Sequence, residues 1–141
     1  MAETKFESKV KTINKSDKDL FEFVTDFTKL GAFIPKDKIE NWQATKETCS
    51  FTIPKVGDGG LEIVHSEPCK MVKYGGTGNL PFALNLWIQF VQVAPNDTKM
   101  KLTIKADLNM MMKMSLKKPL QQGVDQMADQ LTMLFNNMPN L

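Results

Sequence analysis

The side chains of this sequence that could do chemistry are few. His65 is the only histidine and Tyr74 the only tyrosine. His65 lies two residues before Glu67 on one predicted strand, and side chains two apart share a face, so the pair could supply a general base at the mouth of a pocket. The Tyr74 hydroxyl could orient a ligand oxygen. An exposed histidine at a strand end and a tyrosine that packs its ring are the open alternatives, and no catalytic residue is assigned.

Cys49 and Cys69 are predicted to be reduced thiols. Each cysteine begins a predicted strand, and the two strands lie two strand spacings apart, about 9.5 Å. This exceeds the limit of about 7 Å for a disulfide. The sequence has no CxxC, no HxxxH and no carboxylate cluster of the kind that binds metal ions. We therefore expect no metal site and no cofactor.

The basic side chains are all lysines, because the sequence contains no arginine. Arginine is the usual residue for bidentate contacts with phosphate and with guanine edges. A nucleic-acid partner is therefore not expected. The formal net charge of +2 is close to balance.

Length and composition fit one globular domain spanning residues 1–141, with 42% hydrophobic and 24% charged residues. No apolar run approaches the roughly 18 residues of a membrane span. The first residues, MAETKFESKVK, do not resemble a signal peptide. We expect a cytoplasmic protein without integral membrane association.

The first part of the chain predicts one strand followed by two helical pieces. In residues 5–13 the alternation puts Phe6, Ser8, Val10 and Thr12 on one face. Ser16 is a good N-cap for the next helix, with carboxylates in its first turn. That helix should end near Gly31, before a short segment that contains Phe33 and Ile34.

The middle of the chain predicts antiparallel strands. Short strands begin around Trp42 and Phe51, and the glycines at 57, 59 and 60 indicate a turn before LEIVHSEP. The two longest strands, residues 81–93 and 98–108, form a hairpin in which even-numbered residues share the apolar face. Trp87 and Val91 then point outward.

The closing stretch, residues 112–135, predicts a long helix that covers the sheet. Apolar residues recur at steps of three and four, and Pro119 indicates a kink or the true start of the helix. Four methionines, at positions 110, 111, 112 and 114, come just before this apolar stripe, which starts at Leu116. No other predicted element is long enough to cover the apolar face of the strands.

This order of elements resembles the START-like (SRPBCC) superfamily and its helix-grip fold. The segments that carry the resemblance are LEIVHSEPCKMVKYGG, NLWIQFVQVAPNDTKMKLTIKADLN and PLQQGVDQMADQL. The resemblance implies an α+β helix-grip fold: a curved antiparallel sheet of about six or seven strands wrapped around a long C-terminal helix, with two short helices after the first strand. It is most similar to small bacterial members grouped with polyketide cyclases and lipid-transport proteins, which implies a hydrophobic cavity between sheet and helix.

The residues that would line this cavity come from both layers, with His65 at its mouth. On the sheet we expect Phe51, Ile53, Leu61, Ile63, Val72, Tyr74, Leu86, Ile88, Phe90, Leu102 and Ile104, and on the helix Val124, Met127, Ala128 and Leu131.

The same residues could instead form a solid core. The small residues Gly123 and Ala128 and the adaptable methionines favour a space. A dry void of about 300 Å³ would cost on the order of 7 kcal/mol at roughly 24 cal/mol per Å³, so such a space needs an apolar occupant.

The leading functional prediction is an intracellular carrier of a small hydrophobic molecule such as a lipid, a fatty acid or an aromatic metabolite. One alternative is a cyclase or dehydratase in which His65 or Tyr74 moves a proton. Another is an interaction module that uses the outer sheet face at Trp87, Val91 and Val93, with the protein a monomer or a weak homodimer.

In the resembled fold the first and last strands are neighbours. This would align lysines 9, 11, 99, 101 and 105 on the outer surface. The row could contact an acidic partner or an anionic membrane, or be an ordinary solvated face.

Overall fold

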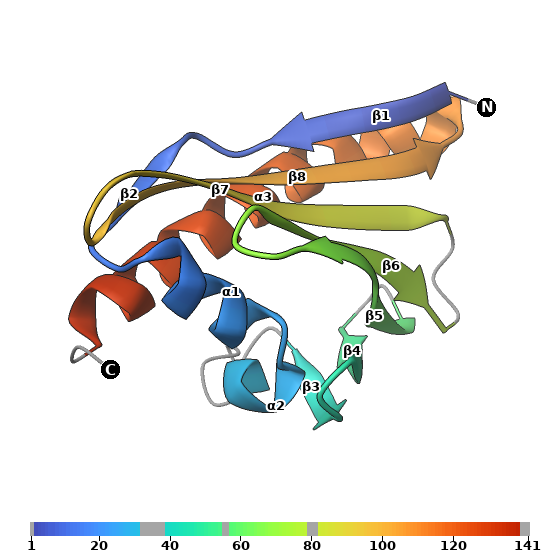
Figure 1. Cartoon of the computed structure of the whole chain (residues 1–141). Helices are drawn as coiled ribbons and strands as arrows, with labels where there is room; N and C mark the ends of the chain where they lie inside the picture. Colours follow the sequence, from blue (N-terminus) through green and yellow to red (C-terminus); the bar gives the residue numbers. More distant parts are fainter. Residues whose placement is uncertain (1, 32–38, 55–56, 79–81, 139–141) are drawn as a thin grey trace.

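The protein folds into one antiparallel sheet with helices on its inner face (Figure 1). The computed structural model describes residues 2–31, 39–54, 57–78 and 82–138, without the side chains of Ala2 and Ile53. The described elements are β1 (Ala2–Glu7), β2 (Lys11–Ile13), α1 (Asp17–Val24), α2 (Phe27–Leu30), β3 (Glu40–Ala44), β4 (Thr48–Ile53), β5 (Gly57–Glu67), β6 (Met71–Thr77), β7 (Leu84–Ala94), β8 (Asp97–Leu108) and α3 (Met110–Asn137).

The sheet has eight strands in the order β1-β8-β7-β6-β5-β4-β3, and β2 also pairs with β8. Together with the two short helices and the long α3, this is the expected α+β class. The additional strand arises because the first predicted strand is broken into β1 and β2.

The break between β1 and β2 shifts the side-chain alternation. Phe6 and Ser8 are buried as predicted, and the Ser8 hydroxyl accepts a hydrogen bond from the backbone N–H of Leu102 at 2.9 Å. Val10 is 62% exposed, while Ile13 is fully buried. The prediction that Val10 and Thr12 share the face of Phe6 is therefore wrong, because pairing with β8 is interrupted between Glu7 and Lys11.

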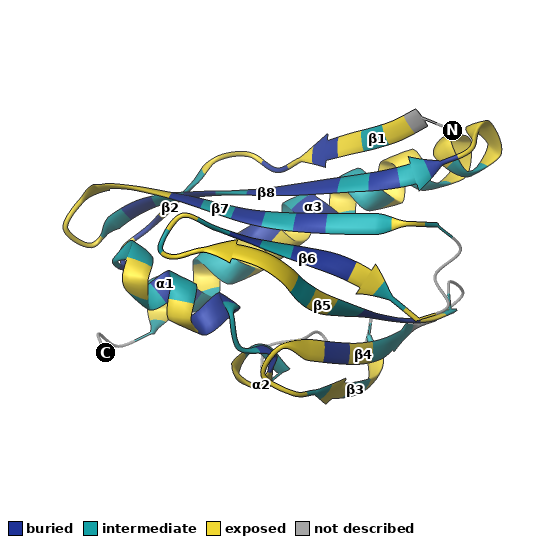
Figure 2. Ribbon diagram, turned by 45° about the vertical axis from the view of Figure 1, so that its right-hand side comes forward, coloured by how far each residue is buried: buried dark blue, intermediate teal, exposed yellow. Residues whose placement is uncertain are grey.

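The predicted hairpin of the two longest strands is confirmed. In β7 and β8, Leu86 lies opposite Ile104 and Ile88 lies opposite Leu102. All four side chains are buried, which makes this hairpin the centre of the core (Figure 2).

The glycines expected to form a turn lie within β5 instead. A side chain on Gly60 would collide with the backbone carbonyl of Cys49 on the neighbouring strand. The close approach of the two backbones explains why a glycine can lie inside this strand.

The helices begin at side-chain caps. The Ser16 hydroxyl accepts from the backbone N–H of Asp19 at 3.2 Å, as predicted for the start of α1. The Asn109 side chain accepts from the N–H of Met112 at 2.8 Å, so α3 begins at Met110 and runs through Pro119. The segment with Phe33 and Ile34 lies outside the described residues.

Helix α3 packs against β8, β1 and β2, whereas α1 packs against β6 and β7 (Figure 1). The second half of α3 is buried at Val124, Ala128 and Phe135. Its first half is only half-buried at Leu116 and Leu120. The fully buried side chains of the covering helix therefore all lie in its second half, where Leu131 and Leu134 are half-buried.

Replacing Pro119 by alanine should stabilise the protein. The proline ring removes the amide hydrogen that would bond to the carbonyl of Ser115, and a proline inside a helix costs about 3 kcal/mol. Because α3 is continuous and Pro119 is exposed, we expect Pro119→Ala to raise the free energy of unfolding by about 1–3 kcal/mol in urea denaturation. Pro119→Gly is the matched control and should gain about 1 kcal/mol less. A less stable Pro119→Ala variant would show that the helix needs the proline here.

Candidate functional site

Apolar side chains on the inner face of the sheet and on the first half of α3 are only half-buried, although they contact the buried core. They come from β3, β4, β5 and β7 of the sheet and from α3, which itself packs against β8, β1 and β2. We call them the inner apolar surface: Trp42, Phe51, Leu61, Ile63, Leu84, Met112, Leu116 and Leu120.

Beside this surface the core is solid. Val72, Leu102 and Val124 have no exposed surface, and Tyr74 has 1%. A side chain without accessible surface cannot border a space that holds even one water molecule. The side chains of the sheet and of the second half of α3 therefore pack directly against one another here.

The predicted cavity residues thus divide into groups. Buried in the core are Val72, Tyr74, Leu86, Ile88, Phe90, Leu102, Ile104, Val124 and Ala128. Half-buried are Phe51, Leu61, Ile63 and Leu131. His65 and Met127 are exposed. The side chain of Ile53 is not among those described. The ligand-binding role of the half-buried group stays a prediction.

His65 does not face the inner side of the sheet as expected. Ile63 lies opposite Tyr74, but the register then shifts, and His65 lies opposite Lys73. Directly opposed residues point to the same side, so Ile63 shares the inner side with Tyr74, and His65 shares the outer side with Lys73. The extra residue, Val64, forms a bulge that reverses the alternation.

The Tyr74 hydroxyl already makes a hydrogen bond within the protein. It donates a hydrogen bond of 2.5 Å to the backbone carbonyl of Val24 at the end of α1. Burial raises the pKa of the Tyr74 phenol far above its ordinary value. The tyrosine thus packs its ring and fastens α1 to β6.

Aromatic rings join the inner apolar surface to the core. The rings of Trp42 and Phe51 are stacked with centroids 6.3 Å apart and an interplanar angle of 9°. Phe27 lies 6.4 Å from Trp42 and 5.4 Å from Tyr74. Since Trp42 and Phe51 are half-buried, part of this aromatic surface remains accessible.

The predicted cavity lining did not include Trp42, Leu84, Met112, Leu116 or Leu120. The spacing of Leu116 and Leu120 along α3 was a usable signal, because it continues the stripe that includes Val124. Trp42 gave no comparable signal, since its strand is short and irregular between Glu40 and Gln43.

Both cysteines are free thiols, as predicted. Cys49 is 5% exposed and Cys69 is half-buried. Burial raises the pKa of the Cys49 thiol to about 11.

Two hollows of about 200 Å³ can be described, and neither opens onto the inner apolar surface. One lies on the outer face of the sheet, lined by Lys5, Glu7, Trp87, Gln89, Lys101, Thr103 and Lys105. The other lies between α3 and the β1–β2 segment, lined by Lys9, Lys11, Asp125, Ala128 and Asp129.

Within the described part of the chain, no group of three or more His, Cys, Asp or Glu side chains could hold a metal ion. Of the described helices, none has the length and apolar character required to cross a membrane.

Several solved structures have the same architecture. Norcoclaurine synthase from Thalictrum flavum superposes with a TM-score of 0.78 at 11% identity, over 98% of this chain and 96% of that one. The protein Mll3558 from Rhizobium loti gives 0.69 at 10% identity, over 94% and 96%. The Aha1 dimer from Colwellia psychrerythraea gives 0.65 at 17% identity, over 94% of each chain.

No protein-family model and no curated protein sequence matches this chain. The likeness to the solved structures is therefore one of fold.

The two cysteines should differ sharply in reactivity. Alkylation needs the thiolate, and burial both shields Cys49 and holds its pKa near 11, above that of an unfolded cysteine. With iodoacetamide at mildly alkaline pH we expect one adduct on the native protein, mapped to Cys69 by peptide mass spectrometry, and two after denaturation. Adducts that form on Cys49 as fast as on Cys69 would contradict its placement in the core.

Proposed function

Because the chain has the START-like helix-grip fold, we propose that its inner apolar surface binds a small hydrophobic or amphipathic molecule. The observation that supports this is the uneven packing of α3. Val124 and Ala128 are 0% and 1% exposed, whereas Leu116 and Leu120 of the same helix stay half-buried.

A bound molecule would complete the burial of these side chains. Removing apolar surface from water contributes about 25 cal/mol per Å². A guest that covers roughly 100 Å² of the protein's apolar surface would thus gain about 2.5 kcal/mol from that side alone. Its own buried surface adds to this gain, so no polar anchor is needed for measurable binding.

Access would follow from separation of the first half of α3 from the sheet. Met110, Met111 and Met114 are 80–82% exposed at this end of the helix. Methionine side chains are flexible and polarizable, so they can adapt to guests of different shape. The half-buried Met112 belongs to the inner apolar surface itself.

The guest would be a lipid, a fatty acid or an aromatic metabolite. The aromatic side chains of Trp42 and Phe51 favour the aromatic metabolite. Trp42 and Phe51 present partly accessible parallel rings, which suit a flat ring by offset stacking. Norcoclaurine synthase, which shares the fold, has been solved in complex with dopamine and hydroxybenzaldehyde, two small aromatic compounds. That complex supports the idea that this architecture accommodates such molecules.

The alternative of a cyclase or dehydratase finds less support in the geometry. His65 lies on the outer face of the sheet. The Tyr74 hydroxyl is bonded to Val24 and its phenol has a raised pKa. Neither group is placed to move a proton on a molecule bound at the inner apolar surface.

We also propose that the protein is a monomer or a weak homodimer. Val91 and Val93, at the end of β7, are 64% and 56% exposed. Two exposed valines make a small apolar patch, which supports at most a weak contact between copies of the protein.

A polar residue at position 116 should weaken binding of an apolar probe. We expect Leu116→Gln to reduce the affinity for Nile red, measured by fluorescence titration, about fivefold, because a change of about 1 kcal/mol in apolar burial corresponds to that factor. Met133→Gln is the control, since Met133 lies on the same helix and is 64% exposed. The affinity of the Met133→Gln variant for Nile red should equal that of the unchanged protein.

Native mass spectrometry of the freshly purified protein, followed by solvent extraction, should reveal a co-purified apolar compound. Equal affinities for the two variants, or a protein that neither binds Nile red nor carries an extractable compound, would contradict the proposed function.

A further inference from the structure

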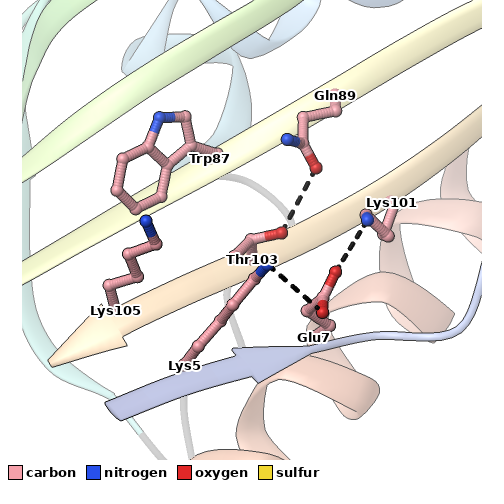
Figure 3. A pocket seen from close by; sticks show the side chains of 7 residues that line it. All are labelled: Lys5, Glu7, Trp87, Gln89, Lys101, Thr103 and Lys105. Atoms are coloured by element: carbon pink, nitrogen blue, oxygen red, sulfur yellow. Dashed lines mark hydrogen bonds and ion pairs between the residues drawn. The ribbon is translucent and has the colours of Figure 1, made fainter. Parts of the chain in front are cut away.

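The outer face of the sheet carries a charged hollow built from residues in register. Glu7 on β1, Thr103 on β8, Trp87 on β7 and Lys73 on β6 lie directly opposite one another across four strands. Thr103 is short and only 4% exposed, and longer side chains surround it (Figure 3). The short residue at the centre of this ring leaves a hollow of about 210 Å³.

Positive charge dominates this hollow. Lysines 5, 101 and 105 line it, and Lys73 lies beside it, whereas Glu7 is the only carboxylate in its lining. Lys5 lies directly opposite Lys105, an arrangement of like charges that is unfavourable on neighbouring strands. An incoming anion would relieve this repulsion.

The one carboxylate is already paired. Glu7 contacts Lys101 at 2.7 Å and Lys5 at 3.5 Å. The hydrogen bond from Lys101 and its positive charge hold the pKa of the Glu7 carboxyl below its ordinary value. Glu7 is thus ionised and paired with Lys5 and Lys101. It forms no ion pair with Lys73 or Lys105.

Lys73 and Lys105 both lie over the Trp87 ring. Their ammonium groups are 5.2 Å and 5.3 Å from the ring centroid. Among the described residues, no carboxylate lies within ion-pair distance of either lysine. A cation over an aromatic ring at an exposed site is held weakly, so both ammonium groups are available to a stronger, charged acceptor.

We propose that this hollow is a docking site for an acidic segment of a partner protein. One carboxylate of the segment lies between Lys73 and Lys105 beside the Trp87 ring, and further carboxylates contact Lys5 and Lys101. A polypeptide fits better than a single small anion, because the lysines are spread over three strands and only a chain brings several carboxylates to them at once.

Two other anionic partners fit this surface less well. Trp87 is half-buried between the lysines that flank it, so a flat lipid surface would not reach its ring. Nucleic-acid surfaces usually combine arginine with several stacking rings, and this sequence has no arginine. The site lies on the side of the sheet opposite α3, so it does not depend on the inner apolar surface.

The test uses a fluorescein-labelled peptide of alternating glutamate and glycine, titrated with the full-length protein by fluorescence anisotropy. We expect saturable binding that weakens as salt is added. The double variant Lys73→Gln/Lys105→Gln should weaken binding about fivefold. Lys117→Gln/Lys118→Gln is the matched control, because both lysines are exposed on α3 and the net charge changes equally. That control should change the affinity less than about twofold.

A second variant tests the hollow itself. Thr103→Gln fills the centre of the ring without adding charge and should weaken peptide binding, whereas Thr103→Val keeps its size and should not. Equal weakening by the two lysine pairs would overturn the proposal, since it would show a response to net charge alone. Absent peptide binding, or tighter binding to phosphatidylserine vesicles or to a single-stranded oligonucleotide than to the peptide, would overturn it too.

Discussion

The packing of the second half of α3 on the sheet is the constraint on which the remaining structure depends. Val124 and Ala128 are buried against the strands, at 0% and 1% exposed. The Phe135 ring meets Phe23 of α1 edge-on, with centroids 5.2 Å apart. The Asn136 side chain accepts from the backbone N–H of Asn14 at 2.7 Å and so ties the helix end to the β2–α1 connection. One end of the helix is thereby fixed.

Because that end is fixed, the two halves of the helix can serve different purposes. The fixed half completes the core together with Tyr74, whose hydroxyl bonds to Val24. In the other half, Leu116 and Leu120 are half-buried and leave apolar surface accessible. The inner and outer faces then carry the two proposed sites, an apolar one that includes Leu116 and Leu120 and a charged one around Trp87.

The sequence predicted most of the fold because alternation and helical spacing report directly on burial. It failed where a single residue shifts the register. The bulge at Val64 turns His65 outward, and the break after Glu7 exposes Val10. Such shifts depend on pairing with a neighbouring strand, which side-chain types do not record. Likewise, the apolar stripe predicted the face of α3 that packs but not which half packs closely, because that depends on contacts such as Phe135 with Phe23.

Methyl NMR during titration with Nile red tests the central claim most directly, because it reports where on the protein a guest binds. We expect chemical-shift changes at the methyl groups of Leu61, Leu116 and Leu120, while those of Val72 and Val124 stay unchanged. Changes centred on Val72 and Val124 would contradict it, because they would place the guest inside the part of the core that is closed in this structure.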